Sequence, residues 1–259
     1  MNYLVASIYY YPVKSLSSSN LKKSIIKKNL GILNDRLFSF SKNIDIKKAK
    51  LVEKFPKLRK LNYFLTLKNS PVLNKYKFSY DANVLILFKG DEKIISILCD
   101  NQDKYNIISH HLLRLEKSIL KPIFLLKNEN YPFFDTTHSN KISNSISLIN
   151  INSIKDLEKK TKKTIEFERF RGNLYIDGIK PWQERNWIKK IIKINDVSYK
   201  VEKNIARCSA INLEPNTDNA TINLPMILKK YYNHIDMGVY LTPLDDGEIN
   251  IGDQVILDE

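Results

Sequence analysis

The sequence has few cysteines, histidines and glycines. Its two cysteines, Cys99 and Cys208, cannot form a disulfide framework, a CxxC pair or an iron–sulfur ligand run. So few thiols fit a reducing compartment, and we expect a cytoplasmic protein. The four histidines show no HExxH or similar spacing, which argues against a zinc site built from histidines. With only 7 glycines, Gly-rich flexible or collagen-like designs are excluded.

Long apolar runs are also missing. No uninterrupted run approaches the roughly 20 residues that a transmembrane helix requires. The first residues, MNYLVASIYYYPVKS, lack the charged region, apolar stretch and cleavage site of a secretory signal. We therefore expect no membrane association. Hydrophobic residues make up 43% and charged residues 27% of the chain, as in a soluble globular protein with ample material for a core.

Positive charge is in excess but is unevenly distributed. Residues 1–130 hold 24 basic and 10 acidic side chains, whereas residues 131–259 hold 18 of each. This excess suggests nucleic-acid binding, with Tyr9, Tyr10 and Tyr11 as a stacking surface. The lysines, however, are scattered and do not alternate with aromatic residues. Because Lys outnumbers Arg 35 to 7, we attribute most of the charge to a lysine-rich surface. The rare arginines then indicate positions where a planar, bidentate side chain is needed.

The hydrophobic pattern predicts many short strands and few helices. Residues 3–11 are typical of a strand, and residues 191–201 of a hairpin that turns at Asn195–Asp196. The C-terminal residues predict two strands, GVYLTPL and EINIGDQVIL, hinged at Asp246–Gly247.

Three segments show helical features. In residues 104–120, Ile108, Leu112, Leu115 and Ile119 recur at helical spacing. Residues 154–163 follow a cap at Asn152–Ser153, and a short helix is expected over 225–233. We therefore predict a mostly β protein with a few helices (α+β), built from two barrel-like units, 1–125 and 126–259. The stretch 128–141 provides the connecting loop.

Two segments near the N-terminus have features of an anion site. Lys14 and Ser15 follow the strand that ends in YYYPV, where an ammonium, a hydroxyl and backbone N–H groups could hold a phosphate. An ordinary strand-terminating loop is the alternative. Asp35 and Arg36 follow Gly31 and precede the strand LFSF. On their own they would form a surface ion pair.

Two further segments lie in the second half. In RFRGNLY, Arg171 and Asn173 stand before a strand, and either an oxyanion site or a structural salt bridge would explain the arginines. In NIARCS, Arg207 precedes Cys208. A neighbouring cation favours the thiolate, which binds soft metals or acts as a nucleophile. The alternative is that Cys208 is an inert free cysteine. We expect Cys99, in the apolar strand IISILCD, to be inert.

Taken in order, these motifs resemble those of MOSC-domain proteins that carry an N-terminal β-barrel domain. The matching segments are IYYYPVKSL, GILNDRLF, SLINI, RFRGNLYIDG, PWQERNWI, ARCSAINLEP and the tail MGVYLTPLDDGEINIGDQVIL. Each motif alone is weak, but seven in the right order and spacing are specific. They cover residues 7–40 and roughly 143–259, and the relatives include the mitochondrial amidoxime-reducing component.

The resemblance implies a binding site for molybdenum cofactor, a pterin dithiolene that carries a phosphate and the metal. It implies that Cys208 is the catalytic residue and ligates molybdenum. It also implies that the other site residues contact the cofactor: Lys14, Ser15, Arg36, Ser145, Ser147, Arg171, Asn173 and Arg207. Pyridoxal phosphate binding is a family-level association only. Some relatives carry a pyridoxal-phosphate desulfurase domain, which we do not expect in this sequence.

The sequence departs from the family pattern at two positions. Gly172 replaces the usual proline of the FRPN motif, and Ala206 stands where relatives often carry a hydroxyl. We also expect no ferredoxin-like module, so electrons would come from separate donor proteins.

The resulting hypothesis is a molybdenum-cofactor oxidoreductase that reduces N-oxygenated or related small substrates. The alternative is a carrier of molybdenum cofactor or sulfur with a persulfide on Cys208. Nucleic-acid binding is a third, weaker hypothesis.

Overall fold

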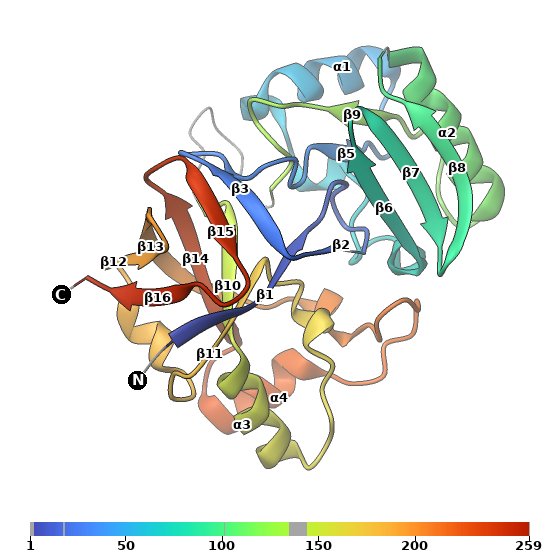
Figure 1. The fold of residues 1–259 in the computed structure, drawn as a ribbon. Helices are drawn as coiled ribbons and strands as arrows, with labels where there is room; N and C mark the ends of the chain where they lie inside the picture. Colours follow the sequence, from blue (N-terminus) through green and yellow to red (C-terminus); the bar gives the residue numbers. More distant parts are fainter. Residues whose placement is uncertain (1–2, 18, 101, 135–143, 259) are drawn as a thin grey trace.

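The computed structural model describes residues 3–17, 19–100, 102–134 and 144–258. Within these residues the largest sheet has eight strands, and a pairing between β1 and β11 closes seven of them into a barrel (Figure 1). The order is β11-β10-β14-β13-β12-β16-β1-β2. The strands span β1 (Tyr3–Tyr10), β2 (Ser19–Leu21), β10 (Ile146–Asn150), β11 (Leu174–Asp177), β12 (Ile191–Ile194), β13 (Val197–Ala206), β14 (Asp236–Pro243) and β16 (Gln254–Leu257).

The barrel forms because its strands alternate between buried and exposed side chains, which is the two-residue period of a sheet with one face in a core. In β12, Ile192 and Ile194 are buried, whereas Lys193 between them is exposed. They pack with Leu148, Val201 and other aliphatic side chains from the neighbouring strands. The hydrophobic pattern of the sequence thus specifies the inner face directly.

One connection in the barrel is parallel and carries a helix. Strands β10 and β11 run parallel, so a crossover must join them, and it contains α3 (Ile151–Thr161). Helix α4 (Leu224–Tyr232) contributes to the same hydrophobic cluster as α3, and Figure 1 shows the two side by side at one end of the barrel. The 3₁₀ helices of this half are η4 (Phe167–Phe170), η5 (Gln183–Trp187) and η6 (Ser209–Asn212).

The other half of the molecule has its own core. A three-stranded sheet and a two-stranded sheet surround buried side chains such as Phe38 and Phe78, and α2 contributes Ile108 and Leu112 to the same cluster. The elements are β5 (Phe38–Phe40), α1 (Ile46–Lys54), η1 (Pro56–Leu58), η2 (Leu61–Tyr63), η3 (Pro71–Lys75), β6 (Tyr76–Asp81), β7 (Val84–Lys89), β8 (Glu92–Leu98), α2 (Gln102–Leu115) and β9 (Leu125–Lys127).

Backbone pairing joins segments from both ends of the chain. Strand β1 pairs with β11 and with β16, and β3 (Lys23–Lys27) pairs with β4 (Gly31–Ile32) and β15 (Gly247–Asn250). The division between residues 125 and 126 stays a prediction. The first strands of the chain nevertheless hydrogen-bond with strands from beyond that division, and the division itself falls within β9. The predicted connecting loop, 128–141, lies partly outside the described residues.

The predicted fold class is confirmed: the regular structure of the described residues is mostly β, with sixteen strands and four α-helices. The hairpin at Asn195–Asp196 is also confirmed, and the short helix expected over 225–233 is present as α4. No helix among the described residues has the length and apolar character to cross a membrane.

Three predicted boundaries were wrong. Helix α3 begins at Ile151, because the Asn150 side chain and not Asn152–Ser153 caps it. Helix α2 ends at Leu115, so Ile119 is buried beyond the helix. The final predicted strand is two strands in different sheets, β15 and β16, because Gly252, with φ +92°, turns the chain between them.

At Gly238, strand β14 lies very close to strand β10. The φ of Gly238 is +80°, and a Cβ there would lie 2.3 Å from the carbonyl oxygen of Leu148 on β10. Gly252 has a similar φ, +92°, but no atom within 4 Å of its Cβ position. Both alanine variants incur a conformational penalty of roughly 1–2 kcal/mol, and only Gly238→Ala adds a backbone clash.

We therefore expect Gly238→Ala to lower the free energy of unfolding in urea by about 3 kcal/mol or more, and Gly252→Ala to lower it clearly less. Equal losses for the two variants would contradict the close approach of β14 to β10.

Candidate functional site

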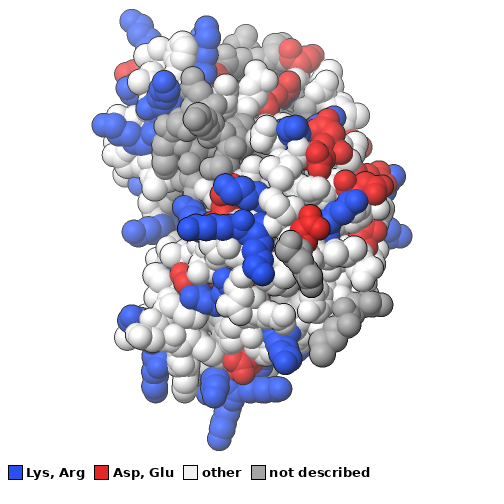
Figure 2. Space-filling model, turned by 90° about the vertical axis from the view of Figure 1, so that its left-hand side faces the viewer, with Lys and Arg blue, Asp and Glu red and all other residues white. Residues whose placement is uncertain are grey.

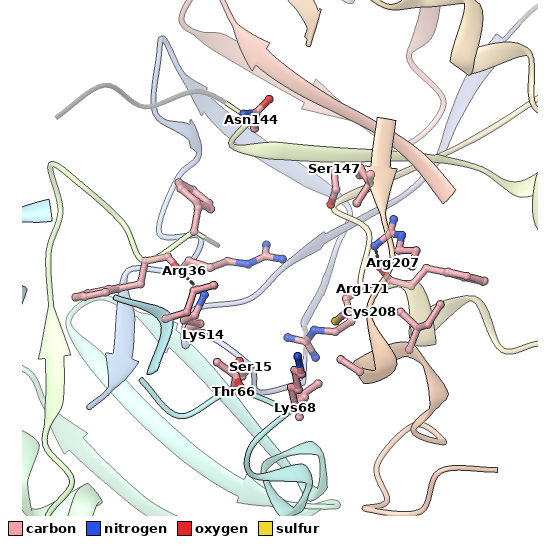
Figure 3. A pocket seen from close by; sticks show the side chains of 18 of the residues that line it. Lys14, Ser15, Arg36, Thr66, Lys68, Asn144, Ser147, Arg171, Arg207 and Cys208 are labelled. Carbon is pink, nitrogen blue, oxygen red and sulfur yellow. Dashed lines mark hydrogen bonds between the residues drawn. The ribbon is translucent and has the colours of Figure 1, made fainter. Parts of the chain in front are cut away.

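A cavity of about 650 Å³ lies where the barrel meets the segment before it. This size is typical of small-molecule sites. The structure brings all nine sequence-predicted site residues to its wall: Lys14, Ser15, Arg36, Ser145, Ser147, Arg171, Asn173, Arg207 and Cys208. Figure 3 shows Lys14, Arg36, Arg171 and Cys208 around this space, on separate segments of the chain. Their placement in one cavity is observed, and their roles toward a ligand stay predictions.

Lys14 and Ser15 occupy the turn that follows β1. Val13 forms a bridge with Phe38, and the backbone N–H of Lys14 donates to the Phe38 carbonyl at 2.8 Å. The Lys14 side chain is 5% exposed and donates to the carbonyl of Phe133 at 3.2 Å. Ser15 has a φ of +68°, so the chain reverses sharply here. The turn therefore holds an ammonium and a hydroxyl at the cavity wall.

Asp35 and Arg36 form a buried pair instead of the surface pair that they would form on their own. Asp35 is 1% exposed, and its carboxylate accepts hydrogen bonds from Arg36 Nη1 at 2.7 Å and from the backbone N–H of Tyr11 at 2.7 Å. Burial raises the pKa of Asp35, while the Arg36 charge and these donors favour the carboxylate. The guanidinium of Arg36 also lies 4.0 Å from the Tyr11 ring centroid, so it is held on two sides.

Arg171 approaches the cavity from a different wall. It has a φ of +51° at the end of η4, and its Nη2 donates to the Leu16 carbonyl at 2.7 Å. Its guanidinium carbon lies 4.6 Å from the Tyr11 ring centroid. Figure 3 shows the guanidinium groups of Arg36 and Arg171 both directed toward the middle of the cavity. Two planar cations thus face the same space.

Asn173 connects the residues behind this wall. Its Oδ1 accepts from the Ser147 hydroxyl at 2.9 Å and from the Ser147 backbone N–H at 3.1 Å. Its Nδ2 donates to the Tyr9 carbonyl at 3.1 Å and to Asp35 at 3.2 Å. Since an asparagine amide has about four hydrogen-bonding positions, this side chain is fully used by the protein. We infer that Asn173 positions Ser147 and Asp35.

Gly172, which stands where the family usually has proline, makes a backbone hydrogen bond that stabilises the fold. Its backbone N–H donates to the Tyr175 hydroxyl at 3.0 Å, a bond that a proline could not make. A Cβ at this position would lie 2.7 Å from Ile149 Cδ1. The hydrogen bond and the close packing restrict the backbone of Gly172, although this residue has no proline ring.

Ser145 is a buried hydroxyl with no hydrogen-bond partner among the described residues. It is 3% exposed and lines the cavity. A buried polar group without a partner is destabilising by about 1–3 kcal/mol, so a ligand that reaches Ser145 Oγ would remove that penalty.

Arg207 and Cys208 follow the end of β13. Arg207 donates from Nε to the Met237 carbonyl at 2.9 Å and from Nη1 to the Phe170 carbonyl at 2.8 Å. Burial lowers the pKa of this guanidinium. Its bonds to carbonyls hold the end of β13 in place, and Cys208 follows directly, exposed and at the edge of the cavity. Arg207 therefore contributes charge and positions the cysteine.

Cys99 and Arg169 lie outside the cavity wall. Cys99 is buried, and burial raises the pKa of its thiol to about 11, as expected for an inert cysteine. Arg169 donates to Glu166 at 2.6 Å, to the Asn212 carbonyl at 2.9 Å and to Thr221 at 2.9 Å. This arginine is structural, which is one of the two explanations that the sequence left open.

One wall of the cavity was not predicted from the sequence. Residues 61–69 contribute six side chains: Leu61, Asn62, Thr66, Leu67, Lys68 and Asn69. The Thr66–Asn69 turn is held by mutual hydrogen bonds, and Lys68 is exposed. No motif marks this segment, so only the folded chain brings it to the site.

The charge of the cavity has one sign. Of its lining residues in the described part of the chain, five are cationic and none is Asp or Glu: Lys14, Arg36, Lys68, Arg171 and Arg207. A low-dielectric wall that carries only cations attracts anions. Among the described residues no three His, Cys, Asp or Glu side chains gather as metal ligands.

Comparison with known proteins gives a family match over the second half of the chain. Residues 135–256 match the family model of the MOSC domain, a domain associated with molybdenum-cofactor-binding proteins. A curated relative, molybdenum cofactor sulfurase 2 of Culex quinquefasciatus, is 30% identical over 76 residues, which cover 29% of this chain and 10% of that protein.

Two solved structures are similar at low identity. The YuaD protein from Bacillus subtilis has a TM-score of 0.45 at 10% identity, over 99% of this chain and 96% of that one. YiiM from Geobacillus stearothermophilus has a TM-score of 0.36 at 16% identity, over 44% and 54%.

The two cysteines should differ in reactivity. We expect Ellman's reagent to modify one thiol of the native protein rapidly and the second only on unfolding, because Cys208 is exposed and burial disfavours the Cys99 thiolate. Cys208→Ser should remove the fast phase, and the matched control Cys99→Ser should retain it. Rapid modification of both thiols in the native protein would contradict the burial of Cys99.

Proposed function

We propose that the cavity binds molybdenum cofactor and that the chain reduces N-oxygenated or related small substrates. The observation that carries this proposal is one cavity whose described lining residues include five cationic side chains, no acidic side chain and an exposed thiol at the edge. An anionic cofactor with its own sulfur ligands needs this combination: cations for the phosphate and a soft protein ligand for the metal. The MOSC-domain match over residues 135–256 supports the same conclusion.

The residues present fit such a group. Ser145 Oγ is a buried hydroxyl that still lacks a partner among the described residues, and it belongs to the cavity wall. Lys14, Ser15 and Arg36 would hold the phosphate, and Arg171 would hold the pterin or another anionic edge. Cys208 Sγ would be the metal ligand. When bound, the cofactor would supply two-electron redox chemistry at the metal.

The chain's own residues would bind the substrate and exclude water around it. Phe133, Phe134 and Phe170 provide an apolar part of the wall, which suits a small aromatic or aliphatic substrate. Reduction of an N-hydroxylated group takes two electrons and two protons, breaks the N–O bond and releases water. The cationic wall stabilises negative charge that develops on the departing oxygen. A separate electron-donor protein would supply the electrons in the cytoplasm.

Cofactor content tests the site directly. We expect about one molybdenum and one pterin per chain in protein from a host that makes the cofactor. Arg171→Met should reduce the pterin content about tenfold or more, since it removes a guanidinium that can donate two charge-assisted hydrogen bonds. Arg114→Met, on the exposed end of α2, is the matched control and should retain both. Wild-type protein without metal or pterin from such a host would refute the proposal.

The second candidate is a carrier of molybdenum cofactor or sulfur. The observation that favours it is the exposure of Cys208 at the edge of the cavity, since a persulfide carrier must present its sulfur to a partner. The curated relative is named a molybdenum cofactor sulfurase, which also fits this reaction type.

Turnover and mass distinguish the two candidates. A reductase should convert benzamidoxime to benzamidine with reduced methyl viologen, and Cys208→Ser should abolish this activity while Cys99→Ser preserves it. A carrier should instead show no turnover, together with a mass addition of about 32 Da on Cys208 that dithiothreitol removes.

A further inference from the structure

One surface beside the cavity combines exposed apolar side chains with lysines that have no acidic partner among the described residues. Residues 46–61, named here the α1 surface, run through α1 and η1 to the start of η2. Five large apolar side chains on it are between 40% and 51% exposed: Ile46, Leu51, Phe55, Leu58 and Leu61. So many exposed apolar residues within one short segment indicate a surface that another molecule covers.

The α1 surface is strongly basic. It holds six lysines, Lys47, Lys48, Lys50, Lys54, Lys57 and Lys60, and its one acidic residue is Glu53. The Glu53 carboxylate accepts from the Lys127 backbone N–H at 2.8 Å, so it faces the protein. Within the described residues, none of the six lysines forms an ion pair with an acidic side chain. Figure 2 shows Lys or Arg side chains projecting at the upper end of the molecule, where Figure 1 places α1.

The α1 surface is attached firmly to the cavity. Arg59 is buried within it, and its guanidinium donates to the Val52 carbonyl at 3.0 Å and to the Tyr131 carbonyl at 2.7 Å. The same guanidinium lies 4.1 Å from the ring centroid of Phe133. Phe133 lines the cavity, and so does Leu61 at the end of the surface. A molecule bound to the α1 surface would therefore sit at the rim of the cavity.

We infer that the α1 surface docks an acidic electron-carrier protein, such as a flavodoxin or a small ferredoxin. This inference rests on the proposed reductase function. Each turnover consumes two electrons at the cavity, so a carrier must bring its redox group close to that rim. An apolar centre with a charged rim is the usual anatomy of such an interface. Lysines without acidic partners complement an acidic protein, which accelerates association in a salt-dependent way.

The test uses a flavodoxin as the electron donor and reduced methyl viologen as a small donor that needs no docking surface. The triple variant Lys50→Glu, Lys54→Glu, Lys57→Glu reverses charge at three exposed positions of the α1 surface. The triple variant Lys159→Glu, Lys160→Glu, Lys163→Glu makes the same charge change at exposed positions at the end of α3. Circular dichroism establishes that each variant is folded.

We expect flavodoxin-driven reduction of benzamidoxime to fall about tenfold or more in the α1-surface variant and to lose its dependence on salt. Methyl viologen-driven turnover should be unchanged in both variants, and the α3 variant should resemble wild type with both donors. Replacing the same three residues by Gln should give an intermediate loss. Unchanged flavodoxin-driven turnover in the α1-surface variant would overturn the inference.

A binding measurement separates failure of the inference from failure of the proposed function. If wild type shows no turnover with methyl viologen, the reductase function fails, but the affinity of the chain for oxidised flavodoxin still decides whether the surface binds an acidic protein. Salt-sensitive binding that the α1-surface variant loses supports the inference. Binding to phosphatidylglycerol vesicles that depends on the same lysines, with no effect on flavodoxin, would instead assign the surface to a membrane and overturn it.

Discussion

The carboxylate of Asp35 holds together three segments that are far apart in the sequence. It accepts from the Tyr11 backbone at the end of β1, from the neighbouring Arg36 and from Asn173 before β11. Asp35 is almost fully buried, and an uncompensated buried charge is destabilising by several kcal/mol, about 3–5 when a partner is removed. Each of the three segments therefore depends on the others, and the cavity wall forms only where they meet.

This network also explains how a cationic cavity can exist. Five cations around one space repel one another, and the protein offsets this by giving several of them a fixed partner behind the wall. Arg36 has Asp35, Arg171 has the Leu16 carbonyl and Arg207 has the carbonyls of Met237 and Phe170. The partners hold each side chain in one orientation, so an incoming anion meets preorganised donors. Lys68, in the part of the wall that residues 61–69 form, is exposed.

Local sequence predicted the parts of this site that depend on short motifs. Arg36 and Arg171 each stand just before a strand that the sequence predicts. Cys208 follows β13, which runs to Ala206 and so beyond the predicted end of the hairpin at residue 201. Residues 61–69 could not be predicted, because nothing in their sequence reveals that they will face Cys208 after folding. Boundary errors had local causes: Asn150 caps α3 in place of Asn152, and Gly252 breaks a run that otherwise reads as one strand. The position of β1 also required the structure, since strand pairing over such distances leaves no local pattern.

The pairing of β1 with β16 places one further requirement on the protein. Tyr3 lies opposite Val255, so the seven-stranded barrel closes only when the first and the last strands are both available. Non-local pairing of this kind forms slowly, because the entropy of closing a long loop is lost before the contacts are gained. During synthesis, β1 gains its pairing with β16 only after residues 254–257 have left the ribosome. A ligand that needs the closed barrel must therefore bind after residues 254–257 have been synthesised.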